Sequence, residues 1–201
     1  MLDSVLKDQL TTLFKDLSEQ YVLDVVVSPT HPKRGELLEM LDELASCSDR
    51  ITCHLKDGEG LQFTIIRNGK STRIKFRSTP NGHEFSSLIL AILNCDGKGR
   101  NLPDEATIER IKNLKGPIDL TTYVNLSCLI CSEIVQSLDV ITIFNEEISH
   151  EIVDGGINKL EVIEKNIMGL PSVYANDDLF LVGRADYSTL LDKLEAKYGT
   201  N

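Results

Sequence analysis

The chain has 201 residues, of which 41% are hydrophobic and 5% aromatic, and its formal net charge is -10. This length and composition suit one large globular domain or two small ones. The acidic balance argues against a nucleic-acid-binding surface, because such a surface needs a basic face to displace counterions from phosphates. No apolar run is long enough to span a membrane, and the first ten residues lack the basic and apolar regions of a signal peptide. We therefore expect a cytoplasmic protein with no nucleic-acid or membrane partner.

Hydrophobic periodicity predicts alternating helices and strands along the whole chain. In the first half we expect an amphipathic helix over 2–17, a strand over 21–27, a helix from about 33, strands near 50–56, 61–67 and 72–77, and helices over 83–94 and 103–114. We expect the last of these helices to carry Pro103 in its first turn. In the second half we expect a strand over 118–124, a helix from 128, a strand over 148–153, a helix near 158–166, strands near 171–175 and 178–182, and a helix over 186–197.

The second half repeats the first at an offset of 97 residues, which aligns I-T-C-H-L-K-D-G (51–58) with I-S-H-E-I-V-D-G (148–155). A chance likeness between two strand and helix units is the alternative explanation. Each half has the element order of a thioredoxin-like fold. We therefore predict an α/β protein of two contiguous thioredoxin-like folds, three-layered as α/β/α and sharing one sheet, with an extra N-terminal helix. The boundaries that we expect are 1–115 for the first half and 116–201 for the second.

The five cysteines are an odd number in a chain of this size, which suits reduced thiols better than a disulfide framework. They are Cys47, Cys53, Cys95, Cys128 and Cys131. The first three have apolar neighbours in helix or strand patterns, so we expect them to pack in the core.

Cys128 and Cys131 form a C-x-x-C pair where a predicted strand leads into a helix. The helix N-terminus presents unsatisfied N-H groups and a partial positive charge, and both stabilise a thiolate. The pattern predicts that Cys128 attacks a disulfide and that Cys131, one turn further along, resolves the mixed disulfide. The sequence also permits an inert apolar pair, because the spacer Leu129-Ile130 supplies no activating group. A zinc site would need two more ligands, and the pattern of the chain offers no second pair.

Pro171 lies directly before a predicted strand in N-I-M-G-L-P-S-V (166–173), about forty residues after the dithiol. A thioredoxin-like fold keeps a cis-proline at this place, facing the first cysteine. There the backbone of Leu170 would be open to an extended partner chain. The first half has G-L-Q-F (60–63) in the comparable place and His31 and Arg34 opposite the two cysteines, so we expect it to be catalytically silent.

The chain resembles, from end to end, the N-terminal domain of the flavoprotein component of alkyl hydroperoxide reductase. The resemblance rests on four segments, which are N-L-S-C-L-I-C-S-E-I-V-Q-S-L (125–138), V-D-G-G (153–156), N-I-M-G-L-P-S-V (166–173) and G-H-E-F-S-S-L-I-L-A-I-L (82–93). It implies a redox pair at Cys128 and Cys131 and a cis-proline at Pro171. It also implies that Glu84 is lent to the redox centre, although a helix-start acid stabilised by the dipole is an equal alternative.

Two features depart from the family's usual pattern, because Leu129-Ile130 stands in place of His-Asn and Ser132 in place of proline. The family further implies a dithiol relay from a flavoprotein reductase portion, in the same chain, to the disulfide of a peroxiredoxin. No G-x-G-x-x-G phosphate loop occurs in these residues, so we expect no cofactor site here and FAD and NADH in reductase domains beyond this fragment.

From the sequence we predict an oxidoreductase module for thiol-disulfide exchange in peroxide detoxification. Two alternatives stay open. One is a free-standing glutaredoxin-like disulfide reductase, and the other is a thioredoxin-fold binding module whose dithiol is inert.

Overall fold

The computed structural model describes residues 2–201 and divides into two compact units, Met1–Thr79 and Pro80–Asn201. Each unit contains a sheet with helices packed against it, and the two are described separately below. Among the helices of residues 2–201, none combines the length and the apolar character needed to cross a membrane.

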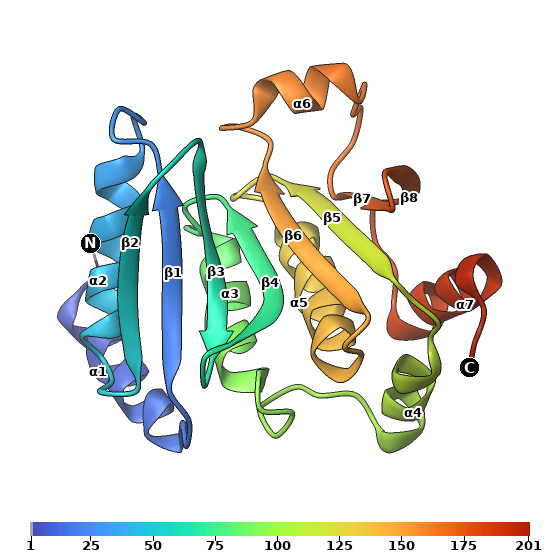
Figure 1. Cartoon of the computed structure of the whole chain (residues 1–201), viewed down its shortest axis with the longest axis horizontal. Coiled ribbons are helices and arrows are strands. Elements are labelled where there is room, and N and C mark those ends of the chain that lie inside the picture. Colours follow the sequence, from blue (N-terminus) through green and yellow to red (C-terminus); the bar gives the residue numbers. More distant parts are fainter. Residues whose placement is uncertain (1) are drawn as a thin grey trace. The chain divides into compact units, whose positions relative to one another are not determined.

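The first unit contains a four-strand sheet in the order β2-β1-β3-β4. Its elements are α1 (Ser4–Leu13), η1 (Phe14–Asp16), β1 (Tyr21–Val27), α2 (Arg34–Ala45), β2 (Ile51–Asp57), β3 (Leu61–Arg67) and β4 (Lys70–Arg77). β1 pairs in parallel with β2 and antiparallel with β3, and β3 pairs antiparallel with β4. Alternate side chains of β1 are buried, which is the period-2 pattern of a strand with one face on a core. Figure 1 shows α1 and α2 on one side of these strands.

The N-terminal helix α1 is held on the first unit by apolar and ionic contacts. Asp3 caps it by accepting a hydrogen bond from the Leu6 N-H, and Leu10 and Phe14 are buried. The Glu43 carboxylate on α2 accepts the Leu2 N-H at 2.6 Å and pairs with Lys7 at 2.9 Å. These contacts confirm the extra N-terminal helix that the sequence predicts.

The second unit contains a four-strand sheet in the order β6-β5-β7-β8. Its elements are α3 (His83–Asn94), α4 (Glu105–Asn113), β5 (Ile118–Val124), α5 (Leu129–Phe144), β6 (Ile148–Asp154), α6 (Lys159–Glu164), β7 (Ser172–Ala175), β8 (Asp178–Val182) and α7 (Tyr187–Tyr198). β5 pairs in parallel with β6 and antiparallel with β7, as β1 pairs with β2 and β3.

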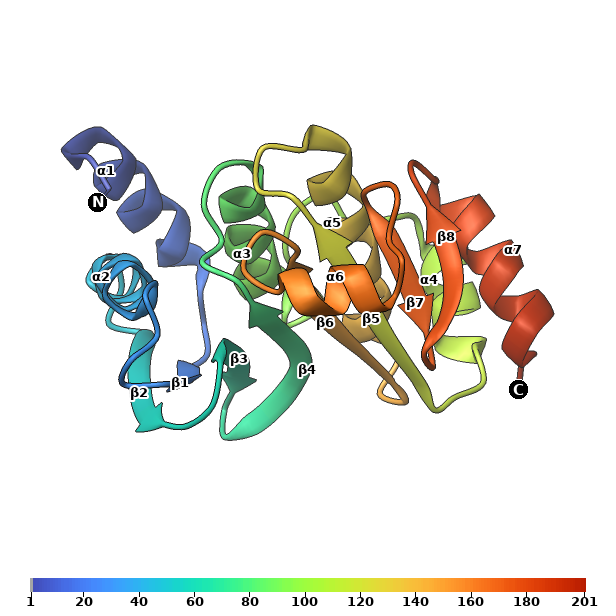
Figure 2. The same cartoon turned by 90° about the horizontal axis from the view of Figure 1, so that it is seen from above.

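Helices cover both faces of this second sheet. One face and the helices α4, α5 and α7 enclose the larger core, which includes Leu120, Leu138 and Leu191. The opposite face carries a smaller cluster of Tyr123, Val153 and Tyr174, against which α6 and the loop after it pack. α3 packs beside α5, and Figure 2 shows these two helices next to each other.

The repeat that the sequence predicts is confirmed in the strands. β5 and β6 begin and end 97 residues after β1 and β2, and the pairing of Ile118 with Ile148 repeats that of Tyr21 with Ile51. The compact units divide earlier than the sequence repeat, at Thr79. Residues 80–115 therefore pack with the second unit, although the sequence repeat assigns them to the first half.

The start of α4 differs in detail from the sequence prediction. The helix begins at Glu105, so Pro103 precedes it and does not occupy its first turn. Asp104 is the N-cap, and its carboxylate accepts the Thr107 N-H at 2.8 Å. This cap satisfies a backbone N-H that has no partner within the helix. Its stabilisation outweighs the preference of proline for the first helical position.

Candidate active site

The dithiol lies where β5 gives way to α5 in the second unit. β5 ends at Val124, and the loop 125–127 leads to Cys128, which is the N-cap of α5. The Cys128 sulfur accepts the backbone N-H of Cys131 at 3.3 Å. This is the contact by which a helix N-terminus stabilises negative charge on an N-cap side chain.

The loop before Cys128 is tightened by its own polar groups. The Asn125 side-chain oxygen accepts both the N-H and the hydroxyl of Ser127, and the Asn125 carbonyl accepts the Cys128 N-H at 2.9 Å. The cysteine therefore enters the helix from a fixed turn.

The two cysteines of the pair differ in exposure. Cys128 is half-buried, whereas Cys131 is fully buried. Burial raises the pKa of Cys131 to about 12, and the neighbouring Cys128 and the Glu84 charge add to the rise while the Asn125 backbone opposes it. The thiol of Cys131 is therefore protonated at neutral pH and needs a base before it can attack.

The spacer between the cysteines presents apolar side chains to solvent. Leu129 is 56% exposed and Ile130 is 37% exposed. Ser132 is buried and donates its hydroxyl to the Leu129 carbonyl at 2.9 Å, which closes the first turn of α5. The two residues between the cysteines are thus both apolar and solvent-accessible.

The peptide bond between Leu170 and Pro171 is cis, as the sequence predicts, and Pro171 is buried. Beside it a shallow hollow is lined by the end of β5, the Gly155-Gly156 turn and the segment from Ile167 to Leu170. Asn125 of the dithiol loop and Leu170 of the proline loop both line this hollow. That Pro171 faces Cys128 stays a prediction.

Glu84 lies in the first turn of α3 and is completely buried. Within residues 2–201 neither oxygen of its carboxyl group has a hydrogen-bond partner. Burial raises the pKa of Glu84 to about 7. The nearby Ser87 hydroxyl lowers this pKa, although it makes no hydrogen bond to the Glu84 carboxyl group, and the Asp139 charge raises it further. Glu84 is therefore no solvated helix-start acid, and its charge acts on the Cys131 thiol.

The start of α3 is fixed to the dithiol loop by the backbone. The His83 N-H donates to the Leu126 carbonyl at 3.0 Å, and His83 itself is exposed. Gly82 has φ +59, and a Cβ there would lie 2.4 Å from the Leu126 carbonyl oxygen. Only glycine allows this approach, which carries Glu84 into the interior.

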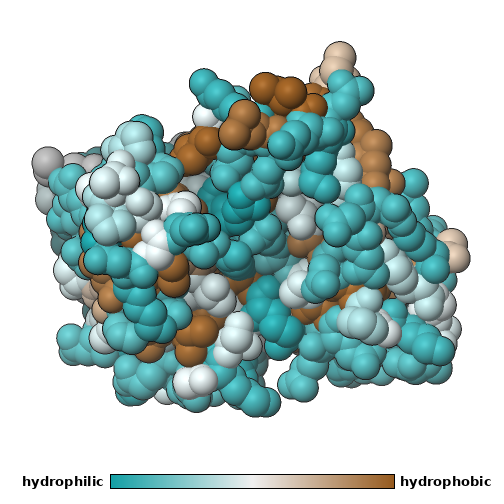
Figure 3. All heavy atoms as spheres, turned by 45° about the horizontal axis from the view of Figure 1, so that its top comes forward, coloured by the Kyte–Doolittle hydropathy of each residue, from teal (hydrophilic) through white to brown (hydrophobic). Residues whose placement is uncertain are grey.

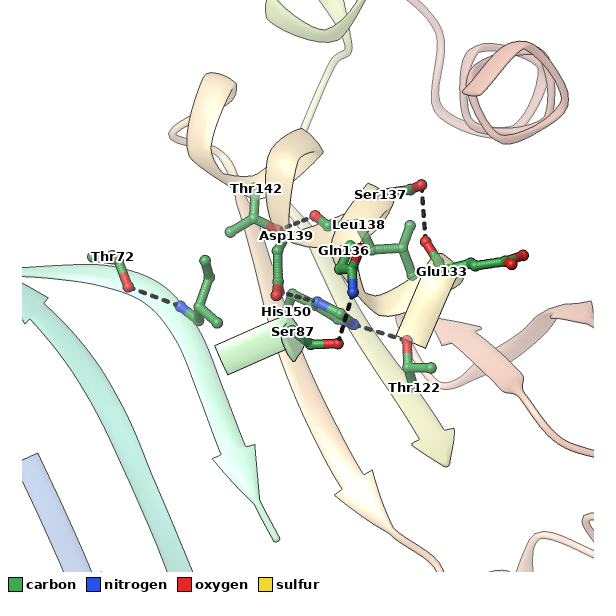
Figure 4. A network of polar contacts seen from close by, with 11 residues as sticks. Thr72, Ser87, Thr122, Glu133, Gln136, Ser137, Leu138, Asp139, Thr142 and His150 are labelled. Atoms are coloured by element: carbon green, nitrogen blue, oxygen red, sulfur yellow. Dashed lines mark hydrogen bonds and ion pairs between the residues drawn. The ribbon is translucent and has the colours of Figure 1, made fainter. Parts of the chain in front are cut away.

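The sequence reasoning missed a buried polar chain in the second unit. The Asp139 carboxylate on α5 bonds His150 Nδ1 on β6 at 2.7 Å, and His150 Nε2 meets the Thr122 hydroxyl on β5 at 2.8 Å (Figure 4). All three residues are at most 2% exposed. The available signal was His150 at a core position between Ile148 and Ile152, because a buried imidazole needs polar partners.

The other three cysteines lie away from this chemistry. Cys47 and Cys95 are buried, which confirms the expectation of core packing, and Cys53 is half-buried. Burial, followed by the Asp42 charge, raises the pKa of Cys53 to about 12. Within residues 2–201 no group of three or more histidine, cysteine, aspartate or glutamate side chains is arranged to hold a metal ion.

In the first unit, the residues that lie 97 positions before the two cysteines make hydrogen bonds and an ion pair at the start of α2. Arg34, opposite Cys131, donates to the Val27 carbonyl at 2.8 Å and pairs with Asp57 at 2.9 Å. His31, opposite Cys128, accepts the Lys33 N-H at 3.1 Å. No sulfur occupies this place.

A C-x-x-C pair at the start of a helix, with a cis-proline before a later strand, defines a thioredoxin-like protein with a dithiol. Over nearly its whole length the chain is similar to the alkyl hydroperoxide reductase protein AhpF of Pseudomonas aeruginosa, at 33% identity over 197 residues. It is also 36% identical over 195 residues to a protein named NADH dehydrogenase from Ferdinandcohnia aciditolerans. These alignments cover 97% and 96% of this chain, which spans 37% of the length of each relative. No family model matches the chain.

Solved structures confirm the fold. The NTD_N/C domain of alkylhydroperoxide reductase AhpF from Enterococcus faecalis superimposes with a TM-score of 0.88 at 23% identity, over 96% of this chain and 100% of that one. A protein disulfide oxidoreductase from Aeropyrum pernix superimposes with a TM-score of 0.83 at 18% identity, over 98% of this chain and 95% of that one. The prediction of thioredoxin-like α/β folds is therefore confirmed.

We expect Gly82→Ala to lower the free energy of unfolding of the second unit by about 1–3 kcal/mol, because alanine is strained at this φ and its Cβ meets the Leu126 carbonyl. Gly183→Ala is the matched control, since Gly183 has φ +86 with open space around it. Urea unfolding of both variants is the measurement. Equal losses in the two would show that the contact with Leu126 contributes nothing.

We expect the charge on Glu84 to make stability depend on pH. A glutamate whose pKa is about 7 in the folded state and 4.5 otherwise holds more protons when folded, so stability falls as pH rises from about 4.5 through 7. Relative to the parent, Glu84→Gln should therefore gain about 2–3 kcal/mol between pH 5 and pH 8. Urea unfolding at both pH values tests this, with the exposed first-turn acid of α4 changed in Glu105→Gln as the control. A flat difference for Glu84→Gln would contradict the burial argument.

Proposed function

We propose that this chain is a thiol-disulfide oxidoreductase module that passes electrons from a flavoprotein reductase portion to the disulfide of a peroxiredoxin. The observation that carries the proposal is the Cys128 sulfur at the N-cap of α5, bonded to the Cys131 N-H above a buried second thiol. This arrangement separates an attacking sulfur from a resolving one. The similarity to the alkyl hydroperoxide reductase protein AhpF supports the direction of electron flow and the class of partner.

In the first step the Cys128 thiolate attacks one sulfur of the partner's disulfide. The partner's sulfur-sulfur bond breaks, a bond between Cys128 and that sulfur forms, and the other partner sulfur leaves as a thiolate. The N-H of Cys131 and the positive end of α5 stabilise the attacking charge before the step.

In the second step Glu84 takes the proton of Cys131, and the Cys131 thiolate attacks Cys128. The mixed disulfide breaks, the Cys128-Cys131 disulfide forms, and the partner leaves fully reduced. A carboxyl group whose pKa is about 7 is a suitable acceptor, because a base is most effective when its pKa lies near the working pH. Glu84 is thus proposed as a catalytic residue beside Cys128, Cys131 and Pro171.

Pro171 and its neighbours are proposed to receive the partner chain. The cis bond at Leu170 and the hollow beside it suit an extended segment that pairs with the Leu170 backbone. Large apolar side chains are exposed on the elements that surround the dithiol, namely Leu129, Ile130, Leu160, Ile163 and Met168. Figure 3 shows brown, hydrophobic surface gathered along the upper edge of the face that it draws. Such a surface suits a protein substrate better than a small hydrophilic thiol.

The electrons are proposed to reach Cys128-Cys131 from a reductase portion with FAD and NADH, which lies outside these residues. The chain spans 37% of the length of relatives whose names include a reductase and an NADH dehydrogenase. No cofactor is needed for the exchange step itself, since thiolates and disulfides carry both electrons.

We expect Cys131→Ser to trap a mixed disulfide with the peroxiredoxin and Cys128→Ser to trap none, because attack needs the Cys128 sulfur and release needs the Cys131 sulfur. Mass spectrometry under non-reducing conditions is the measurement. Cys53→Ser, which removes a half-buried cysteine of the first unit, should behave as the parent. Trapping by Cys128→Ser alone would reverse the two roles, and no trapping by either variant would support an inert dithiol.

We expect the chain to speed peroxide reduction by a peroxiredoxin when dithiothreitol supplies electrons, and to give no turnover with NADH and added FAD. The reason is that a dithiol exchanges with thiols but does not accept hydride. Peroxide consumption is measured with peroxiredoxin present, with Cys128→Ser as the control. A rate with dithiothreitol equal to that of peroxiredoxin alone would exclude the relay, and turnover with NADH alone would exclude a separate reductase portion.

A further inference from the structure

The hollow beside the cis-proline loop has the size and lining of a pocket for a side chain. Its volume is about 450 Å³, which suits a small apolar group. Apart from Asn125, its lining consists of glycines and apolar residues, and none of these described lining residues has a charged side chain. Such a lining accepts an apolar side chain and disfavours a carboxylate, which would lose its hydration there.

The walls of the hollow are held by bonds within the chain. The Gly155 N-H donates to the Val124 carbonyl at 3.0 Å, and the Ile167 N-H donates to the Val162 carbonyl at 3.0 Å. The Val162 and Ile167 side chains also pack against the smaller core cluster of the second unit. The hollow is therefore formed before a partner arrives, so little ordering is needed when a side chain enters it.

Glycine at three of the nine lining positions keeps space in the hollow. A Cβ on Gly155 would lie 3.1 Å from the Val162 side chain, and a Cβ on Gly169 would lie 3.2 Å from the Val182 side chain. Larger residues at these two positions would crowd the walls. Met168 also lines the hollow and is 89% exposed, so it forms part of the rim.

The hollow is continuous with the places where a partner segment is proposed to meet the chain. Asn125 precedes Cys128 in the dithiol loop and Leu170 precedes the cis peptide bond, and both residues line the hollow. Successive side chains of an extended segment point to opposite faces. A segment that pairs with Leu170 would thus direct a side chain near its own cysteine towards the hollow.

The segment that forms most of the hollow is specific to the second unit. Residues 155–171 join β6 to β7 and supply most of the lining, whereas residues 58–60 alone join β2 to β3 in the first unit. The hollow therefore belongs to the unit that contains the dithiol.

We propose that this hollow is a subsite that selects partner disulfides with a large apolar residue beside the reactive cysteine, and that Met168 is a specificity-determining residue at its rim. The proposal deepens the thiol-disulfide exchange proposed above and rests on it. It defines the substrate class as apolar extended segments of proteins, and it disfavours glutathione, which carries carboxylates on both sides of its cysteine.

The test uses short blocked peptides whose single cysteine forms a mixed disulfide with 5-thio-2-nitrobenzoate. The residues on both sides of this cysteine are leucine, glutamine or glutamate, and the glutathione mixed disulfide is a fourth probe. The Cys128 thiolate attacks the peptide sulfur, the disulfide bond breaks, and the coloured thiolate leaves with the electron pair. The rate of the Cys128→Ser, Cys131→Ser double variant is subtracted to remove the remaining cysteines.

We expect the leucine peptide to react about fivefold to tenfold faster than the glutamine peptide, because the hollow buries apolar area of the leucine side chain. The glutamate peptide and the glutathione probe should react more slowly still. Equal rates for the leucine and glutamine peptides, or a faster reaction of the glutathione probe, would overturn the proposed specificity.

Met168→Lys should lower the ratio of the leucine rate to the glutamate rate by about fivefold, because it places a cation at the rim of the hollow. Leu179→Lys is the matched control, since Leu179 is a 59% exposed apolar residue of the same unit that lies outside the lining. The control should keep the ratio of the parent. An equal fall in both variants would show a general effect of charge and would overturn the role of Met168.

A binding measurement separates the subsite from the exchange reaction. The leucine peptide is made with serine in place of cysteine and titrated into the parent chain, and the backbone amide signals are followed by NMR. The signals of Gly155, Gly156 and Gly169 should shift, whereas those of Gly97 and Gly199 should not. Unchanged lining signals would overturn the subsite, and shifts that follow protein concentration alone would assign the hollow to a second copy of this chain. Shifts without any Cys128-dependent release of the coloured thiolate would instead overturn the exchange function.

Discussion

The hydrogen bond from the Cys131 N-H to the Cys128 sulfur is the interaction on which the site depends. It makes Cys128 the N-cap of α5, so the sulfur takes the place that an oxygen of serine or aspartate takes in other helices. The same bond sets the second cysteine one turn deeper, where it is fully buried. One attacking and one protected sulfur thus follow from where the helix begins, and a shift of the cap by one residue would remove the difference.

The packing of α3 on α5 adds the acid that this arrangement lacks. A buried thiol whose pKa is about 12 does not ionise by itself at neutral pH, and α5 has no acidic residue in its first turn. Glu84 enters from α3, where the glycine turn at Gly82 lets the backbone meet the Leu126 carbonyl. The helix that carries the acid is thus tied to the loop that carries the first sulfur. Residues 80–115 belong to the second unit for this reason, whatever repeat they belong to in sequence.

The strands and the dithiol could be predicted because their signals are local. Runs of β-branched and other apolar residues bounded by turn residues predicted β1 and β5, and the 97-residue offset predicted that the second half repeats the first. The C-x-x-C spacing with a later proline indicated the candidate site. The burial of Glu84 could not be predicted, because a helix-start glutamate has the same sequence whether it faces water or another helix. The Asp139 to His150 bond joins a helix to a strand, and no spacing rule predicts it. Tertiary packing decides both, and it also overrode the expected place of Pro103 at the start of α4.

A comparison of the two repeats shows which residues occur only in the unit that contains the C-x-x-C pair. Their first two strands have the same bounds at the same offset, so the backbone alone does not distinguish a reactive unit from a silent one. Arg34 stands in the first unit at the position of Cys131. Its guanidinium donates to the Val27 carbonyl at the end of β1 and pairs with Asp57, which fixes the start of α2. Val25, which lies 97 residues before Thr122, is fully buried, whereas Thr122 completes the polar chain of the other unit. The second thiol and the bonded Asp139, His150 and Thr122 side chains therefore occur in the same unit.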